Sequence, residues 1–107
     1  MDRILTRTEE YLLLAVLKLK NNAYPVTIFD EIEKATKSSG TIGAIYFPLQ
    51  RLEETGLLTS FLGNPTAERG GKSRRFYQLT EAGLQALASA RKAQEDMWRG
   101  IEWEPVK

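Results

Sequence analysis

The 107-residue chain contains no cysteine and no histidine. It can therefore form no disulfide, has no thiolate nucleophile or imidazole base, and lacks the side chains that most often bind zinc and other transition metals. We expect no metal site and no cofactor. A long hydrophobic run is also missing, because the longest one extends only from Tyr11 to Leu17 and is too short to cross a bilayer. No signal-peptide pattern precedes it, so a cytoplasmic location without a membrane partner is expected.

Catalysis without cysteine or histidine would have to rest on carboxylates or lysines. The acidic pair Glu53 and Glu54 falls on a predicted helix. Adjacent helical residues point about 100° apart, so these two carboxylates cannot form a paired acid/base site. We predict that the chain is not an enzyme.

Net charge is nearly absent as well, since 15 Lys and Arg face 14 Asp and Glu and leave +1. The balance differs along the chain. Residues 34–79 carry seven basic and three acidic side chains, or +4, whereas residues 1–33 sum to −2 and residues 80–107 to −1. Only the middle of the chain would attract a polyanion, although a solvated basic face is an equally good interpretation of charge alone.

Hydrophobic spacing predicts two helices in the first third of the chain. The first begins with Thr8 as its N-cap, ends at Asn21-Asn22 and is apolar on nearly every side, which favours a buried position. The second follows Pro25 and ends near residues 37–40, a turn-forming run. Its inward side chains are expected to be Val26, Ile28, Phe29 and Ile32.

A third predicted helix begins at Thr41 and ends at Gly56, and its two faces differ. The face expected to point to the core carries Ile42, Ile45, Tyr46, Leu49 and Leu52. The opposite face carries Gly43, Ala44, Phe47, Gln50 and Arg51. Two very small residues and an aromatic ring are poor choices for a face meant only for water. Pro48 within the helix should remove a hydrogen bond or bend it.

Residues 57–62 and 74–79 predict the two strands of a β-hairpin, with Phe76 on the core side and a long glycine-rich tip at residues 64–73. A last helix begins after Thr80 and runs towards Arg99. The order helix, helix, helix, hairpin, helix is that of a winged helix-turn-helix domain. In this plan the second and third helices form the helix-turn-helix unit and the hairpin forms the wing. The expected fold class is mainly α with a β-hairpin.

Three stretches of the sequence resemble one family. They are residues 22–28 (NAYPVTI), residues 43–58 with the string Tyr-x-x-Leu-x-Arg-Leu-Glu-x-x-Gly, and residues 69–83, where Arg-Gly-Gly precedes Tyr-x-Leu-Thr-x-x-Gly. From about Thr8 to Leu87 the chain resembles the PadR family of bacterial winged-helix transcriptional regulators. Pro48 stands two places after Tyr46, where many members have proline directly after the tyrosine. Residues 63–68 also lengthen the wing, and both departures are read as subfamily marks.

The resemblance implies a dimeric DNA-binding regulator, usually a repressor, whose C-terminal helix supplies the dimer contact. Residues 1–80 then form the winged helix-turn-helix DNA-binding domain, and residues 81–107 form a C-terminal dimerisation helix and tail.

A recognition helix meets base edges in the major groove with its first residues, which must be small or polar. Gly43 and Ala44 suit that need, and close packing against another helix is their alternative. Phe47 can meet a thymine methyl group, and Gln50 can bond adenine. The candidates for this contact are Ser39, Thr41, Gly43, Ala44, Phe47 and Gln50.

Basic side chains would supply the phosphate contacts. On the wing the candidates are Arg69, Lys72 and Arg74. Arg51 has two interpretations. It contacts a phosphate, or it pairs within its helix with Glu54 or Thr55, an exposed pair that stabilises by only about 0.3–0.5 kcal/mol.

The last helix carries one continuous stripe of apolar and small residues. The stripe consists of Ala86, Leu87, Ala90, Ala93, Met97, Trp98 and Ile101. A lone domain of this size cannot easily cover it, so a homodimer is expected, and folding back onto the first helix is the alternative. A two-fold dimer would place the recognition helices about 34 Å apart and call for a pseudo-palindromic operator.

Some PadR-like regulators bind aromatic compounds between the C-terminal helices and the core. By that resemblance Tyr11, Met97 and Trp98 are candidates for a pocket for a small aromatic effector. Trp98 suits a dimer-core or helix-end anchor as well. The leading hypothesis is a sequence-specific repressor that binds double-stranded DNA as a homodimer. The alternative is a winged-helix module that binds protein and not DNA, against which the basic wing counts.

Overall fold

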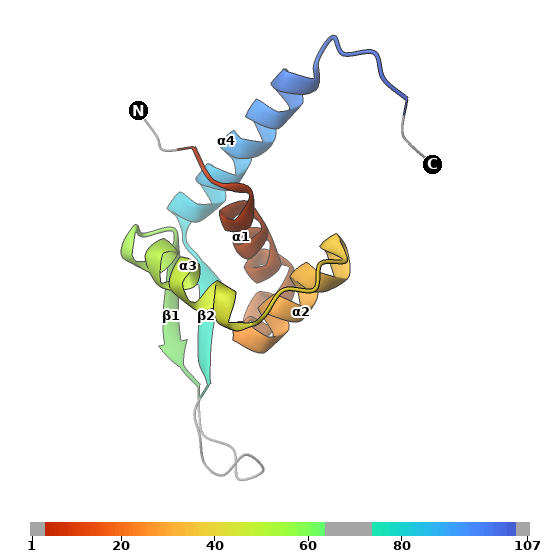
Figure 1. Ribbon diagram of the computed structural model, residues 1–107. Coiled ribbons are helices and arrows are strands. Elements are labelled where there is room, and N and C mark those ends of the chain that lie inside the picture. The colour runs from red at the N-terminus through yellow and green to blue at the C-terminus, as the bar shows by residue number, and fades with distance from the viewer. Residues whose placement is uncertain (1–3, 64–73, 105–107) are drawn as a thin grey trace.

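The computed structural model describes residues 4–63 and 74–104. Its elements, in chain order, are α1 (Arg7–Leu19), the short 3-10 helix η1 (Lys20–Asn22), α2 (Pro25–Thr36), α3 (Gly43–Glu54), β1 (Leu58–Leu62), β2 (Arg75–Leu79) and α4 (Glu81–Trp98). Figure 1 shows α1 at the centre of the body, with α2, α3 and the hairpin around it and α4 leading away. The predicted fold class, mainly α with a β-hairpin, is confirmed.

One hydrophobic core holds α1, α2, α3 and β1 together. The largest fully buried side chains are Leu12, Leu13, Val16, Ile28, Leu49, Leu52 and Leu58. Leu14 and Leu17 of α1 are exposed, because the neighbours of α1 leave that side of the helix open. The predicted buried position of this helix therefore does not extend to these two residues.

The N-cap of α1 is Thr6, not Thr8. The backbone N–H of Glu9 donates to Thr6 Oγ1 at 3.1 Å, and the N–H of Thr6 donates to Glu9 Oε1 at 2.8 Å. This reciprocal capping box needs an acid or amide three residues after the cap. Thr6 has Glu9 there, whereas the residue three places after Thr8 is Tyr11.

Two side chains expected in the core lie outside it. Val26, in the first turn of α2, is 48% exposed, and Tyr46 of α3 is 52% exposed. The buried stripe of α3 consists of Ile45, Leu49 and Leu52, with Ile42 at its edge. At 100° per residue Tyr46 lies about 80° from the centre of that stripe, which is far enough to leave it on the rim.

The hairpin is antiparallel, with Leu58 opposite Leu79 and Phe61 opposite Phe76. Tyr77, not Phe76, is the core residue of β2 and is only 7% exposed. The prediction failed here because two aromatic residues are adjacent, and strand alternation alone does not show which of them faces inward. The other edge of β2 is also bound, since the N–H of Tyr77 donates to the carbonyl of Ala23 at 2.8 Å.

The first turn of α4 is fixed to the body. Thr80 caps the helix by accepting from the N–H of Gly83 at 3.0 Å. A Cβ at Gly83 would collide with the carbonyl oxygen of Leu57, so only glycine lets α4 start this close to the turn before β1. Beyond Ala90 every described residue of α4 is exposed. The near end of the helix thus belongs to the body, and the far end projects from it (Figure 1).

Candidate nucleic-acid interface

The outward face of α3 is open to solvent along its length. Its five residues, Gly43, Ala44, Phe47, Gln50 and Arg51, are all exposed, and Phe47 is 66% exposed. A Cβ at Gly43 would have no atom within 4 Å. Close packing of Gly43 and Ala44 against another helix of the described chain is therefore excluded.

The turn before α3 is exposed too and carries Ser39 and Thr41. It begins at Lys37, which ends α2 in the left-handed conformation (φ 56°) while its N–H donates to the carbonyl of Glu33 at 2.7 Å. The N–H of Ala44 then donates to the carbonyl of Thr41 at 3.1 Å and opens the next helix. The structure thus places all seven candidates on α3 and the preceding turn on one accessible stretch.

The side chain of Arg51 pairs with neither Glu54 nor Thr55, its two expected partners within the helix. The guanidinium carbon lies 5.8 Å from the centroid of the Phe47 ring, one turn earlier on the same face. In the described chain it forms no ion pair with Glu54. The hydroxyl of Thr55 donates to the backbone carbonyls of Arg51, at 3.0 Å, and Leu52, and not to the side chain of Arg51. The guanidinium therefore remains available to an external anion.

Arg74 is the one wing candidate within the described ranges; Arg69 and Lys72 lie outside them. Its side chain is half-buried, and the guanidinium carbon lies 4.4 Å from the centroid of the Tyr24 ring. Its carbonyl accepts from the N–H of Gly63 at 2.7 Å, which continues the ladder past the last strand residues. Arg74 is thus held at the root of the wing.

A polar chain fastens α3 to the hairpin. Ser60 of β1 donates to Glu53 Oε2 at 2.6 Å, and Arg75 of β2 donates to Ser60 Oγ at 2.9 Å. Burial, with a smaller contribution from the Glu53 carboxylate, raises the pKa of Tyr77, so this phenol stays neutral. These contacts fix α3 relative to the hairpin.

We call α2, α3 and the hairpin, residues 25–62 and 74–79, the reading head. The basic side chains of the reading head differ from those of α4 in their ion pairing. On α4 the cations pair within their own segment: Arg91 with Glu95 at 3.2 Å, Lys92 with Asp96 at 3.3 Å and Arg99 with Asp96 at 2.9 Å. In the described part of the reading head, Lys34, Lys37, Arg51 and Arg74 form no ion pair.

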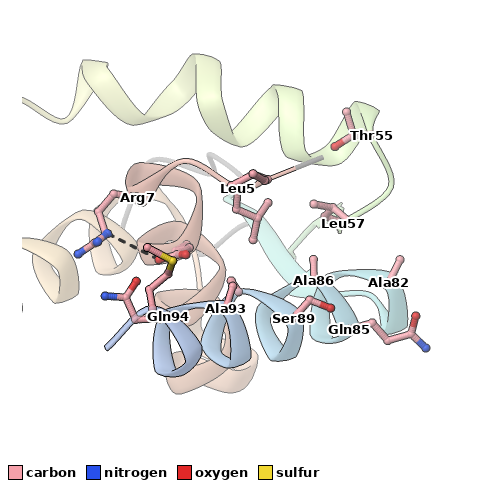
Figure 2. A pocket seen from close by; sticks show the side chains of 14 residues that line it. Leu5, Arg7, Thr55, Leu57, Ala82, Gln85, Ala86, Ser89, Ala93 and Gln94 are labelled. Atoms are coloured by element: carbon pink, nitrogen blue, oxygen red, sulfur yellow. Dashed lines mark ion pairs between the residues drawn. The ribbon is translucent and has the colours of Figure 1, made fainter. Parts of the chain in front are cut away.

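A groove of about 990 Å³ runs between α4, the N-terminal segment and the turn before β1. Figure 2 shows the small side chains of Ala86, Ser89 and Ala93 along one side and Leu5 and Leu57 across from them. We call it the α4 groove; its full lining is Ile4, Leu5, Arg7, Glu10, Thr55, Leu57, Ala82, Gln85, Ala86, Ser89, Ala90, Ala93, Gln94 and Met97.

The candidate effector residues are only partly brought together. Met97 lines the α4 groove, whereas Tyr11 and Trp98 are not among its lining residues. The Trp98 ring instead lies 4.9 Å from the ring of Trp103.

The apolar stripe of α4 divides in the same way as the helix. Leu87 is buried and Ala86 and Ala90 are half-buried against the body; the exposed members are Ala93, Met97, Trp98 and Ile101. In the described chain, folding back onto α1 therefore covers only the near part of the stripe.

Sequence reasoning missed one feature of the interface, a set of three aromatic rings at the root of the wing. Phe61 stacks on Phe76 at 5.8 Å, and Phe76 meets Tyr24 edge to face at 5.5 Å. The signal available was the antiparallel register, which places Phe61 opposite Phe76. Nothing in the local pattern brings Tyr24 to them.

Two kinds of feature are absent from the described ranges, residues 4–63 and 74–104. They contain no helix with the length and hydrophobicity that a bilayer crossing requires. They also contain no cluster of three acidic side chains arranged to hold a metal ion.

The helical body, the antiparallel hairpin and the open face of α3 define a winged helix-turn-helix protein. The model of the transcriptional regulator PadR-like family matches residues 13–89, which is most of the chain. The chain belongs to this family. It is a transcriptional regulator and not an enzyme.

Solved structures share the fold. A PadR-like transcriptional regulator from Bacillus cereus has 19% identity over 87% of this chain and 92% of its own, with a TM-score of 0.66. A transcriptional regulator from Clostridium thermocellum has 20% identity over 84% and 82%, with a TM-score of 0.70. A PadR family regulator from Eggerthella lenta has 23% identity over 83% and 75%, with a TM-score of 0.66. No curated protein sequence matches the chain.

Proposed function

We propose that this regulator binds double-stranded DNA in a sequence-specific manner, as a homodimer on a pseudo-palindromic operator, and acts as a repressor. The observation that carries the proposal is the outward face of α3. It exposes two residues without bulk, an aromatic ring, an amide and an arginine, and Glu54 lies on the same face in its last turn. Such a face adds little to the stability of the domain without DNA. It fits the major groove, where small residues allow the helix to approach the bases closely.

Each side chain on this face has a chemical partner in DNA. The Phe47 ring can contact a thymine methyl group, Gln50 can bond the N6 and N7 edge of adenine, and Arg51 can bond a phosphate or a guanine. No described carboxylate pairs with Arg51 or Arg74, so both guanidinium groups are available to bind DNA phosphates. Arg69 and Lys72 of the wing are proposed as further phosphate contacts.

The far half of α4 is proposed as the dimer contact. Met97 and Trp98 are exposed on a helix that projects from the body, and a second copy would cover them. In this division residues 1–80 bind DNA and residues 81–107 dimerise, although the first turns of α4 also pack on the body. Two-fold symmetry then sets the spacing of the two recognition helices near one turn of DNA, about 34 Å.

Control by a small planar aromatic compound is proposed at the α4 groove, near Met97. Trp98 and Trp103 report on this end of the helix. Titration with planar aromatic compounds should change their fluorescence, and unchanged emission at all concentrations would remove this part of the proposal.

A regulator of this kind works in the cytoplasm, where bacterial DNA lies.

A gel shift with the DNA upstream of the chain's own gene, repeated across salt concentrations, tests the main proposal. Binding should weaken steeply as salt rises, because bound phosphates release counterions, and a shuffled fragment of equal length should bind less tightly. Gln50→Ala should reduce the preference for the upstream fragment over the shuffled one more than it reduces binding to the shuffled one. Absent or salt-independent binding at low salt would favour the protein-binding module instead.

A further inference from the structure

The root of the wing holds an arginine on a stack of aromatic rings. Phe61 and Phe76 stack across the hairpin, Tyr24 meets the edge of Phe76, and the Arg74 guanidinium lies 4.4 Å from the centroid of Tyr24. We infer that this stack positions the Arg74 guanidinium for a phosphate of bound DNA, which makes Tyr24 a positioning residue for that contact. The inference rests on the proposed function and adds to it a residue that does not itself touch DNA.

The Tyr24 backbone is fixed from the side of the helix-turn-helix unit. Its N–H donates to Thr27 Oγ1 at 3.0 Å, and that hydroxyl in turn donates to the carbonyl of Asn22 at 2.6 Å. The residue before it, Ala23, is fully buried and accepts from the N–H of Tyr77 in β2. Tyr24 is therefore held by the start of α2 and by the sheet together.

Arg74 is fixed from the side of the wing. Its carbonyl accepts from Gly63 at the end of β1. A Cβ at Gly63 would come within 2.6 Å of the Phe76 ring, so the absence of a side chain lets Phe76 lie over this point. The backbone of Arg74 and the ring beneath its side chain are thus both anchored, and they come from elements far apart in the sequence.

A guanidinium over an aromatic face keeps the N–H donors on its rim for bidentate bonds to a phosphate. A carboxylate partner would instead occupy those donors, and no described carboxylate pairs with Arg74. If the side chain at position 74 only had to cover the Tyr24 ring and stabilise the fold, an apolar residue would be sufficient and no charge would be needed. The arrangement stabilises the geometry of the cation without neutralising it, which is what a preorganised anion contact requires.

The affinity of the full chain for labelled upstream DNA, measured by fluorescence anisotropy across salt concentrations, tests the inference. Arg74→Ala should lower the salt slope by about 0.9, as for one lost phosphate contact. Tyr24→Leu should weaken binding by about threefold to tenfold, and Tyr24→Phe, which keeps the ring, should restore most of it. In the Arg74→Ala background Tyr24→Leu should have no further effect.

A second measurement reads the stack without DNA. The Nε–Hε proton of Arg74 should show a ring-current shift in NMR spectra of the wild type and Tyr24→Phe, and lose it in Tyr24→Leu and in Tyr24→Met. These spectra also show whether each variant is folded. An unshifted resonance in the folded wild type would overturn the inference even if the leucine variant were too unstable for binding work.

The binding outcomes separate the inference from the proposed function. Suppose that the wild type binds DNA and that Tyr24→Leu lowers the affinity by the same factor in the wild-type and Arg74→Ala backgrounds. Tyr24 then acts on the fold and not through Arg74, and the inference is wrong. The same holds if Arg74→Ala binds with unchanged affinity and slope. If the wild type shows no salt-dependent binding, the proposed function fails, and the inference fails with it.

Discussion

The basic side chains of the reading head and those at the far end of α4 differ in their partners. On α4 each described cation pairs with a carboxylate three or four residues away. In the reading head, Arg51 and Arg74 lie against aromatic rings, and no described carboxylate pairs with them. The difference lies in the partners of the cations and not in net charge, because the reading head itself carries five basic and five acidic side chains.

The two regions also differ in how firmly they are held. The core packs α1, α2, α3 and β1 around fully buried leucines, whereas every described residue after Ala90 is exposed. The boundary between them falls inside α4 and not at its first residue. A body held by the core suits base readout and an uncovered helix suits a partner, so the proposed division of function is better drawn near Ala90 than between residues 80 and 81.

The largest expected effect tests where that boundary lies. Leu87 is buried near the start of α4, so Leu87→Ala should reduce the free energy of unfolding by about 2–5 kcal/mol in urea denaturation. Met97 is 77% exposed, and Met97→Ala in dilute protein should change it by less than about 0.5 kcal/mol. Equal losses would remove the distinction between the two halves. A loss for Met97→Ala that grows with protein concentration would support contact between copies.

The next effect compares one substitution in the two regions. Gly83→Ala places a Cβ against the carbonyl of Leu57 and should destabilise the fold by about 1–3 kcal/mol. Gly43→Ala meets no atom within 4 Å and should stabilise it by about 0.4–1 kcal/mol. Thermal unfolding followed by circular dichroism measures both.

Gly43→Ala has a second readout, because the proposed function places this residue against DNA. The variant should bind upstream DNA more weakly while being more stable. A variant that is more stable and binds as well as the wild type would show that the start of α3 does not need to approach the bases so closely.

Much of this organisation could be predicted from the sequence. The helices, the hairpin and the stop at Gly56 just after α3 carry periodic patterns and local stop signals, and the predicted bounds agree with the structure to within a few residues. Gly56 adopts a left-handed φ of 83°, which favours glycine, so this helix stop can be recognised from a single residue. The open face of α3 was also predicted, since its composition contrasts with the buried face.

What failed depends on neighbours distant in the sequence. Whether Phe76 or Tyr77 faces the core is decided by which side of the hairpin α1 and α4 cover. The placement of Tyr24 under Arg74 depends on the segment before α2 lying along the free edge of β2. No local window contains that contact. The wing residues Arg69 and Lys72 stay predictions.

A matched pair of arginine variants tests the charge comparison itself. Arg51→Ala removes a cation without a described carboxylate partner from α3, and Arg91→Ala removes a self-paired cation from α4. Arg51→Ala should weaken binding to upstream DNA about tenfold at low salt and lower the salt slope by about 0.9. Arg91→Ala should leave both unchanged. Equal losses for the two would mean that net charge, and not its placement, governs binding.

The smallest effect concerns the ion pair that joins the body to the reading head. Lys18 of α1 lies 2.9 Å from the Glu31 carboxylate of α2, and its hydrogen bond lowers the pKa of Glu31. The folded protein then binds this proton less readily than the unfolded chain does. The stabilisation is therefore present above the ordinary glutamate pKa of about 4.3 and is lost as the pH falls through the lowered value.

Melting temperatures measured between pH 6 and pH 3 should show this loss as a small decline that is absent in both Glu31→Gln and Lys18→Gln. The double variant should melt like either single one, because only one interaction is removed. Added salt should shrink the difference, since the lysine is largely solvent-exposed. A decline of the same size in Glu31→Gln would place the acid sensitivity elsewhere and leave α2 held to α1 by apolar packing alone.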